Sequence, residues 1–311
     1  MDITALSEVY GFNIKSCLEI TGGWSAAAYV LQTNRCSFFL KVYDKHRHSS
    51  LPWIKRIDGY MPLLLRLNEN AALRGRVPQP ALTLDGRYKH EDERFIYLLS
   101  RDIDGVTIAK SQLSDGQVEE LADILFALHS LRPPCPESLE IPTEDFDISF
   151  CDEIAAFSKN PNICGKAAGI LFRHSSKLSE KILKIKTLSQ RLKAAPPKFV
   201  LCHTDVHGWN LMQSKRLHLI DWEGVRLAPP EADLFVFTRG FFFDYASAAF
   251  YEHYRDITGG FTPNPDALEF YRLRRRLEDI HDFAASLLHD ELNDASRSEA
   301  LYHLENECRL L

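Results

Sequence analysis

The sequence predicts an α+β fold in which a strand-rich first third is followed by a long helical part. Short apolar segments bounded by glycine, asparagine or aspartate turns recur up to Ser100. From Ser114 onward, apolar residues recur at intervals of three and four, which is the spacing of a helix face. At 311 residues, the chain is long enough for two lobes.

The composition excludes several classes of protein. Hydrophobic residues make up 45% of the chain and charged residues 26%, as in globular proteins. The formal net charge of −6 argues against a nucleic-acid partner, which usually needs a basic face, and is compatible with a cationic substrate. Seven cysteines without paired spacing favour a reduced, cytoplasmic protein. The N-terminus does not resemble a secretory signal, and Arg239 and Asp244 interrupt the most apolar stretch, so we expect no membrane span.

The densest chemistry lies in residues 199–223, FVLCHTDVHGWNLMQSKRLHLIDWE. One apolar run leads into Asp205 and Asn210, and a second run ends at Asp221. Three oxygen-bearing side chains in this order suit Mg²⁺, which prefers carboxylate and amide oxygens together with phosphate. In kinases, such a loop aspartate accepts the proton of the attacking hydroxyl, while the asparagine and the later aspartate hold the metal. We assign these three roles to Asp205, Asn210 and Asp221.

Two other interpretations of the same stretch stay open. His203, His207 and His218 could form a zinc cluster, because His-x-Asp-x-His also occurs in metal hydrolases. A zinc site, however, gives no reason for Asn210 or for the acid after the second apolar run. The polar residues could also do no more than cap the turns of a hairpin.

The loop HTDVHGWN resembles the HGDLHPGN type of catalytic loop, and LIDWE resembles the metal segment IDW or IDF(E) of the aminoglycoside phosphotransferase and choline kinase superfamily. Within it, spectinomycin-phosphotransferase-type sequences are the most similar. The resemblance implies a protein-kinase-like fold that uses ATP, with GTP as the alternative, and Mg²⁺. Thr204 stands where glycine is common, and the bulky Trp209 stands where a small residue is usual, which leaves the acceptor open.

The resemblance also divides the chain. It implies a nucleotide-binding lobe at 1–98, with a five-stranded antiparallel sheet and one main helix. A hinge at 99–104 follows, and then a mostly helical lobe at 105–311 that carries the catalytic loop and the acceptor site. We expect the strands at residues 16–20, 26–32, 37–43, 80–84 and 93–100.

Two segments of the first lobe are expected to bind nucleotide. Gly22, Gly23 and Ser25 lie between the first two strands; adjacent glycines allow close approach of phosphate, although a plain turn would look the same. By resemblance, this is the nucleotide-covering loop. Lys41 lies in the apolar run FFLKVY, where burial is costly unless the ammonium meets negative charge. It fits the kinase lysine that pairs with the α- and β-phosphates and a helical acid, with a solvent-facing lysine as the alternative.

The partner of Lys41 and the hinge are less clearly marked. Residues 53–73 have helical spacing and contain two acids, of which Asp58 lies nearer the expected position. By resemblance, the backbone of the hinge binds the purine, which places Leu99, Ser100 and Arg101 there by position alone.

The acceptor is expected to meet Trp209, Glu223, Asp279 and Asp282. The last two belong to a predicted helix over 265–289, whose acids either face a cationic substrate, as in aminoglycoside kinases, or form a solvated face.

We therefore expect transfer of the ATP γ-phosphoryl group to a hydroxyl of an aminocyclitol or aminoglycoside antibiotic such as spectinomycin, conferring resistance. A cytoplasmic monomer or weak dimer, with no nucleic-acid or membrane partner, is the expected state. A kinase of choline, homoserine, a thioribose or an amino sugar is the first alternative. A non-catalytic nucleotide-binding module is the second, and the retention of Lys41, Asp205, Asn210 and Asp221 speaks against it.

Overall fold

The computed structural model describes residues 3–20, 26–135, 138–157 and 165–311. The chain divides into two compact units. The first unit consists of Met1–Pro142, Val200–Leu227 and Val236–Phe261, and the second of Thr143–Phe199, Ala228–Phe235 and Thr262–Leu311. The predicted lobe boundaries at 98 and 104 stay a prediction.

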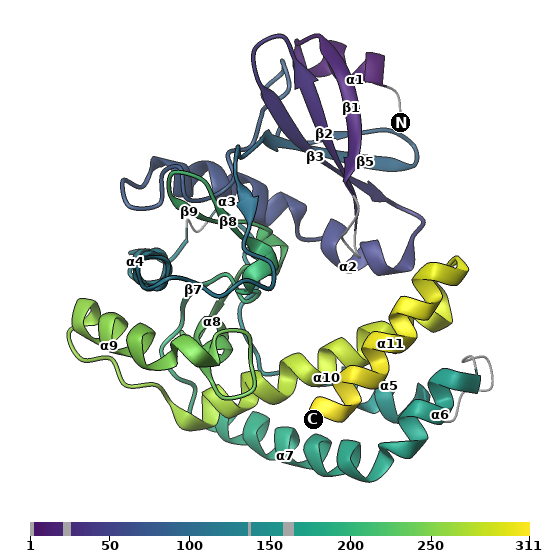
Figure 1. The fold of residues 1–311 in the computed structure, drawn as a ribbon, viewed down its shortest axis with the longest axis vertical. Helices are drawn as coiled ribbons and strands as arrows, with labels where there is room; N and C mark the ends of the chain where they lie inside the picture. The colour runs from purple at the N-terminus through teal and green to yellow at the C-terminus, as the bar shows by residue number, and fades with distance from the viewer. Residues whose placement is uncertain (1–2, 21–25, 136–137, 158–164) are drawn as a thin grey trace. The chain divides into compact units, whose positions relative to one another are not determined.

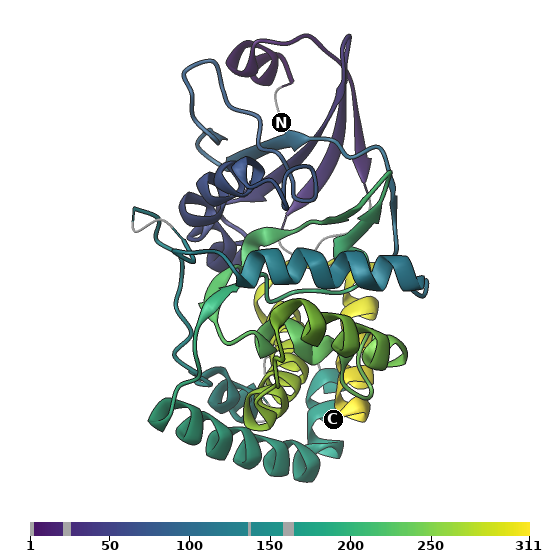
Figure 2. The same cartoon turned by 90° about the vertical axis from the view of Figure 1, so that its left-hand side faces the viewer.

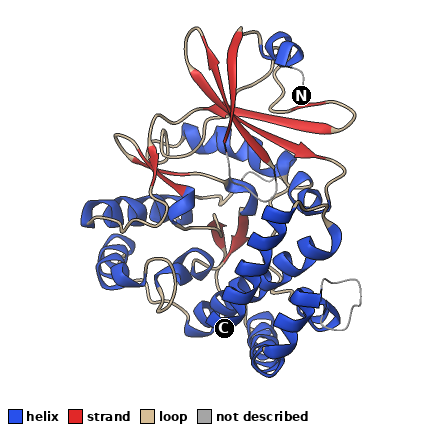
Figure 3. Ribbon diagram, turned by 45° about the vertical axis from the view of Figure 1, so that its right-hand side comes forward, coloured by secondary structure: helices blue, strands red, loops and turns tan. Residues whose placement is uncertain are grey.

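A five-stranded antiparallel sheet forms one end of the first unit (Figures 1 and 3). Helix α1 (Ile3–Tyr10) packs on it, because Leu6 and Tyr10 join a core of apolar side chains from the central strands. The predicted sheet and its antiparallel pairing are thereby confirmed. In spatial order the strands are β1 (Ile14–Ile20), β2 (Ala27–Thr33), β3 (Ser37–Asp44), β5 (Phe95–Arg101) and β4 (His90–Glu91).

The strand predicted at 80–84 is wrong, and β4 is the fifth strand instead. Pro80 makes only an isolated bridge to Ser100, although the amide of Ala81 donates to the carbonyl of Leu99 at 2.8 Å. Pro78 and Pro80 lack an N–H group, so this segment lies along β5 without forming a regular ladder.

The single helix expected over 53–73 is divided into α2 (Leu51–Ile54) and α3 (Ile57–Glu69). Helix α3 buries one face, which includes Tyr60 and Leu64. It contacts the short 3₁₀ helix η3 (Trp222–Gly224), and this contact links the helix to residues that follow Asp221 in sequence.

The rest of the first unit supports the polar segment 199–223. Helix α4 (Asp115–His129) begins with a capping box in which Ser114 and Gln117 satisfy each other's backbone amides. It lies against β7 (Val200–Cys202) and against the hairpin of β8 (Leu211–Gln213) and β9 (Leu217–Leu219) (Figure 2). The remaining elements of this unit are η1 (His48–Ser50), β6 (Val106–Thr107), η2 (Gly208–Asn210), η5 (Asp244–Ala246) and α9 (Ser247–Thr258). Two short elements, β10 (Arg226–Ala228) and η4 (Phe235–Phe237), have residues in both units.

The second unit is helical, and α10 (Pro265–His289) is its central element (Figure 1). Its Arg274 pairs with the buried carboxylate of Glu144 at 2.8 Å, and Tyr271 donates to the same group. The helices around it are α5 (Phe150–Phe157), α6 (Gly165–Arg173), α7 (Ser175–Ala194), α8 (Glu231–Leu234) and α11 (Asp294–Leu310). No helix in the described ranges has both the length and the apolar character that a membrane span needs.

Candidate active site

Asp205 and Asn210 meet in the loop between β7 and β8, as the sequence predicts. The amide nitrogen of Asn210 donates to the Asp205 carbonyl at 2.9 Å and to its Oδ2 at 2.8 Å. Nε2 of His207 lies 3.3 Å from Oδ1 of the same carboxylate. The Asp205 side chain is therefore fixed by two neighbours but is still 31% exposed, which leaves it accessible to a reactant.

His203 joins this loop to the segment that carries Asp221. Its Nδ1 accepts from the Asp205 amide at 3.2 Å, and its Nε2 donates to the Ile220 carbonyl at 2.9 Å. These two partners require a neutral ring protonated at Nε2. The ring is fully buried and packs edge-on against Trp222. The sequence placed His203 only in a zinc cluster, because a side chain whose partners are backbone groups leaves no pattern of its own.

Asp221 begins η3 in a left-handed conformation with φ of 67°. An aspartate tolerates this region better than most residues other than glycine. The amide of the preceding Ile220 donates to the Asn210 carbonyl at 2.9 Å, so both ends of the segment are held together. We call residues 203–221 the polar hairpin.

Lys41 reaches this hairpin from β3. Its ammonium donates to Asp221 Oδ1 at 2.7 Å and also pairs with Glu223. Burial opposes the charge of Lys41, but the carboxylates of Asp221 and Glu223 raise its pKa above the ordinary value. The structure therefore brings Lys41 to the Asp221 segment, a contact that the sequence analysis did not predict.

Glu223 lies inside the protein, although the sequence placed it at the acceptor. Its side chain is only 7% exposed, and it accepts a hydrogen bond from the Tyr43 hydroxyl. Burial raises the pKa of Glu223, against the lowering effect of Lys41. Tyr60 of α3 hydrogen-bonds Tyr43 and is the donor, because the Tyr43 hydroxyl gives its own proton to Glu223. Burial raises the pKa of Tyr60, and this bond adds to the shift. We call Lys41, Tyr43, Tyr60 and Glu223 the lysine site.

The predicted pairing of Asp58 with Lys41 is wrong. The Asp58 carboxylate is 62% exposed and pairs with Lys89 at 2.6 Å, while Tyr88 donates to it at 3.0 Å. Asp58 lies in the first turn of α3, on the side away from the buried face that carries Tyr60. The shorter aspartate side chain is also poorly suited to reach across from that position.

The other nucleotide contacts expected from sequence are only partly described. Gly22, Gly23 and Ser25 lie outside the described residues. The Leu99 carbonyl and the Arg101 amide are already bonded to Ala81 and to Gln79, both at 2.8 Å, so these two groups are not free for a purine. Ser100 lies between them and pairs with β3. The expectation that Leu99, Ser100 and Arg101 meet a purine stays a prediction.

Two features of the loop were not evident from sequence. A Cβ at Gly208 would lie 2.0 Å from the Ala109 carbonyl oxygen, so only glycine fits there. The neighbouring Trp209 projects outward and is 57% exposed. His207 lies against the ring of Phe242, with centroids 5.3 Å apart, and Phe242 is itself 46% exposed.

The two acids of α10 have local partners within the second unit. Asp279 pairs with Arg275 at 3.0 Å, and Asp282 lies 3.0 Å from Nδ1 of His281. Burial raises the pKa of Asp279 to about 7, although Arg275 opposes the shift. The expectation that Asp279 and Asp282 face the acceptor stays a prediction.

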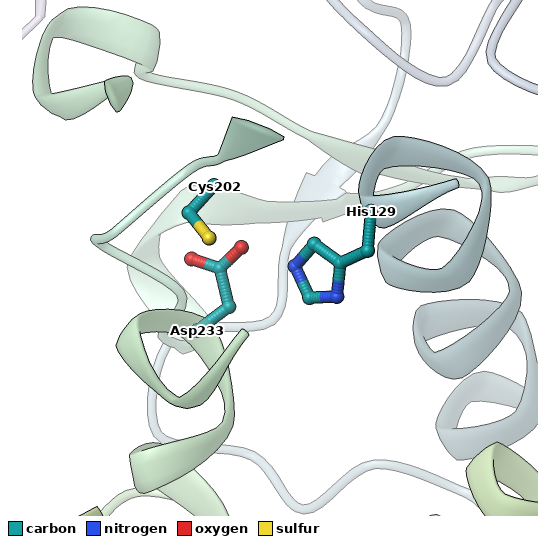
Figure 4. Close-up of side chains that lie close together, drawn as sticks. All are labelled: His129, Cys202 and Asp233. Atoms are coloured by element: carbon teal, nitrogen blue, oxygen red, sulfur yellow. The ribbon is translucent and has the colours of Figure 1, made fainter. Parts of the chain in front are cut away.

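The three histidines of the alternative zinc site do not converge. His203 bonds backbone groups, His207 contacts Asp205, and His218 bonds Ser214 at 2.7 Å. A different histidine, His129 at the end of α4, lies beside a possible metal ligand, Cys202 of β7 (Figure 4). The figure also labels Asp233, which belongs to the second unit. His129 is buried and bonds the Tyr254 hydroxyl at 2.7 Å, which is a packing role.

The donor set of the polar hairpin fits a hard divalent cation. Asn210 turns its amide nitrogen to Asp205, which leaves its amide oxygen for a ligand. The Asp221 side chain is 36% exposed and offers a second oxygen. Oxygen donors of this kind, with water and phosphate completing the shell, are those that Mg²⁺ prefers.

Comparison with known proteins gives the same picture of the fold. The chain is 24% identical over 263 residues to "Protein StrN" of Streptomyces griseus, covering 78% of this chain and 76% of that protein. The structure of spectinomycin phosphotransferase APH(9)-Ia with ADP and spectinomycin matches with a TM-score of 0.79 and 22% identity, covering 99% of this chain and 95% of that one. Choline kinase LicA from Streptococcus pneumoniae matches with a TM-score of 0.60 and 15% identity, over 99% and 96% of the two chains.

These similarities confirm the protein-kinase-like fold predicted from the sequence. The model of the phosphotransferase enzyme family matches residues 16–271, which include Lys41 and the whole polar hairpin. The chain belongs to the phosphotransferase enzyme family.

Proposed function

We propose that this phosphotransferase moves the γ-phosphoryl group of ATP, in the presence of Mg²⁺, to a hydroxyl of a small amino-bearing molecule, with an aminocyclitol as the first candidate. The observation that carries the proposal is the fixed Asp205 carboxylate, joined through His203 to the segment where Asp221 meets Lys41. One protein of this fold, the spectinomycin phosphotransferase APH(9)-Ia, has been seen with ADP and spectinomycin.

Each group has a role that its position supports. Asp205 orients the acceptor hydroxyl and takes its proton, while His207 and Asn210 keep the carboxylate in place. Asn210 and Asp221 would hold Mg²⁺, which supplies positive charge to the transferring phosphoryl group. Lys41 contributes its ammonium to the phosphates, since the pKa of this group is held above its ordinary value.

The proposed acceptor is argued from two observations. The exposed indole of Trp209 lies one residue from Asn210 in the same loop. An indole face attracts a cationic amine and packs on an apolar ring. The net charge of −6 also favours a cation over an anion.

A kinase of another small metabolite is the second candidate. The choline kinase LicA shares the fold over 96% of its own length, and choline is also a cation with a hydroxyl. The metal ligands of the polar hairpin serve the phosphoryl donor, and the indole of Trp209 suits either cation, so the hairpin favours neither acceptor.

An acceptor screen tests the proposal. ADP release would be followed with ATP or GTP, with and without Mg²⁺, across aminocyclitols, aminoglycosides, choline, homoserine, thioribose and amino sugars. We expect release that depends on Mg²⁺ and on one class of acceptor, and that is lost in Asp205→Asn. Spectinomycin turnover identifies the first candidate, and turnover of choline or another metabolite replaces it with the second. A chain that binds ATP but turns over no acceptor contradicts the enzyme assignment.

A further inference from the structure

Helix α3 supplies no carboxylate to Lys41. Its acids are Asp58, which is exposed and paired with Lys89, and Glu69, which pairs with Arg66 near the exposed end of the helix. The α3 side chain that reaches this site is Tyr60, which hydrogen-bonds Tyr43. An ammonium in an apolar strand must be neutralised by other groups.

Asp221, which immediately precedes η3, and Glu223 within η3 take this place, and their exposures differ. Asp221 is 36% exposed, whereas Glu223 is 7% exposed. A partly exposed carboxylate can exchange its ammonium partner for a metal ion and water. A buried carboxylate left without its cation is strongly destabilising, so Glu223 cannot release Lys41 at a similar cost.

Glu223 is also fixed from the other side. The Tyr43 hydroxyl donates to it, and Tyr60 donates to Tyr43. Lys41 and Tyr43 are two residues apart on β3 and therefore point to the same face of the strand. The chain of contacts from Tyr60 through Tyr43 and Glu223 to Lys41 joins α3, η3 and β3 within one unit.

We propose that Glu223 is the permanent carboxylate partner of Lys41, and that it positions the ammonium for the nucleotide phosphates when Asp221 turns to the metal. Glu223 thus does from η3 what a helical acid does in other kinases. It is a positioning residue, because it acts through Lys41. The inference rests on the proposed function, since it requires a nucleotide at Lys41.

A double-mutant cycle on nucleotide affinity tests this role without requiring turnover. ATP binding would be measured by calorimetry, with and without Mg²⁺, for the wild type, Glu223→Gln, Lys41→Met and the double variant. Glutamine keeps the shape of Glu223 but removes its charge. We expect Glu223→Gln to weaken ATP binding about tenfold, and to have almost no further effect once Lys41 is methionine, because residues in direct contact are not additive.

Two further variants separate positioning from a structural role. Glu223→Asp keeps the charge and should recover part of the lost affinity, and Tyr43→Phe should weaken binding in the same direction but less, with the same dependence on Lys41. Asp58→Asn serves as the matched comparison from α3 and should not couple to Lys41. Thermal unfolding of each variant confirms that it is folded, and Tyr43→Phe keeps the test available if Glu223→Gln does not fold.

The possible outcomes are distinct. Losses that multiply in the double variant, or a coupling between Asp58 and Lys41, overturn the inference. A selective rise in acceptor KM with unchanged ATP affinity returns Glu223 to the acceptor contact predicted from sequence. A wild-type chain that binds no nucleotide contradicts the proposed function and the inference together, whereas ATP binding with multiplicative losses contradicts the inference alone.

Discussion

The polar hairpin and the lysine site lie in the same compact unit, but they are assembled in different ways. The hairpin takes Asp205, Asn210 and Asp221 from one continuous stretch, and its contacts follow from the spacing of that stretch. The residues of the lysine site come from β3, α3 and η3, and Lys41 and Glu223 are 182 residues apart in the sequence. A local motif therefore identifies the first site, whereas the second depends on tertiary packing that no motif records.

The largest expected effect is at the centre of the polar hairpin. Asp205→Asn keeps the size of the side chain but removes the proton acceptor, so kcat should fall on the order of 10²–10⁴-fold. ATP affinity should change little, because Asp205 has no charge contact with Lys41 among the described residues. Single-turnover kinetics with calorimetry of ATP binding would measure both. Wild-type kcat in this variant would remove Asp205 from the mechanism.

The contrast also explains what could be read from the sequence. The three polar groups of the hairpin were predicted because turn chemistry and strand length fix their separation. The pairing of Asp58 failed because helical spacing shows which positions are possible but not which acid faces Lys41. Two features of the sequence could have identified Glu223, which we expected at the acceptor: the only acids of residues 53–73 are Asp58 and Glu69, and an acid follows Asp221 by two residues. The strand expected at 80–84 failed because Pro78 and Pro80 cannot donate to a ladder.

A variant of His203 tests how much the stability of the polar hairpin depends on this one buried side chain. His203→Ala removes the partner of the Asp205 amide and of the Ile220 carbonyl and leaves a cavity beside Trp222. Each unsatisfied buried group costs about 1–3 kcal/mol, so for two groups we expect a loss of about 2–6 kcal/mol in unfolding free energy, and a lower kcat. Denaturant titration would measure the loss.

His218→Ala is the matched control for that variant. His218 lies on the same hairpin and bonds the side chain of Ser214 at 2.7 Å, without joining two segments. We expect a loss below about 1 kcal/mol, as for a single side-chain hydrogen bond. Equal losses in the two variants would show that the bridging position of His203 has no special value.

The second unit also has a largely buried carboxylate beside a cation, that of Asp279 next to Arg275. Its pKa is raised to about 7 by burial, above the value of about 3.9 in an unfolded chain. The folded state therefore binds a proton more tightly, and the contribution of Asp279 to stability is present below pH 4 and is lost as the pH rises to 7.

Asp279→Asn removes this dependence. Relative to the wild type, the variant should gain stability between pH 5 and pH 8, on the order of 1–2 kcal/mol, because the side chain is 24% exposed and its shift is partly screened. Thermal unfolding at both pH values would measure the difference. Arg275 loses its charged partner in this variant, so a pH-independent loss would show that the ion pair outweighs the burial of Asp279.

The last comparison concerns the contact between Thr204, at the start of the hairpin, and Gly224, just after its end. Thr204 has a φ of 71°, which is strained for a β-branched residue, but its hydroxyl donates to the Gly224 carbonyl at 2.8 Å. Thr204→Gly removes strain of about 1–2 kcal/mol and a hydrogen bond worth about 1 kcal/mol, so stability should change by less than about 1 kcal/mol. Thr204→Ala keeps the strain without the bond and should be the less stable of the two.

The same contact accounts for the glycine opposite. A Cβ at Gly224 would lie 2.7 Å from the Thr204 hydroxyl oxygen and 3.2 Å from the His203 carbonyl oxygen. Gly224→Ala should therefore destabilise the wild type by about 1–3 kcal/mol through overpacking, and by less in the Thr204→Gly background, where one of the two obstacles is gone. Denaturant titration of the four proteins measures the coupling. Additive losses would mean that the His203 carbonyl alone excludes a side chain at position 224. The effect of replacing Thr204 on stability would then not depend on whether residue 224 is glycine or alanine.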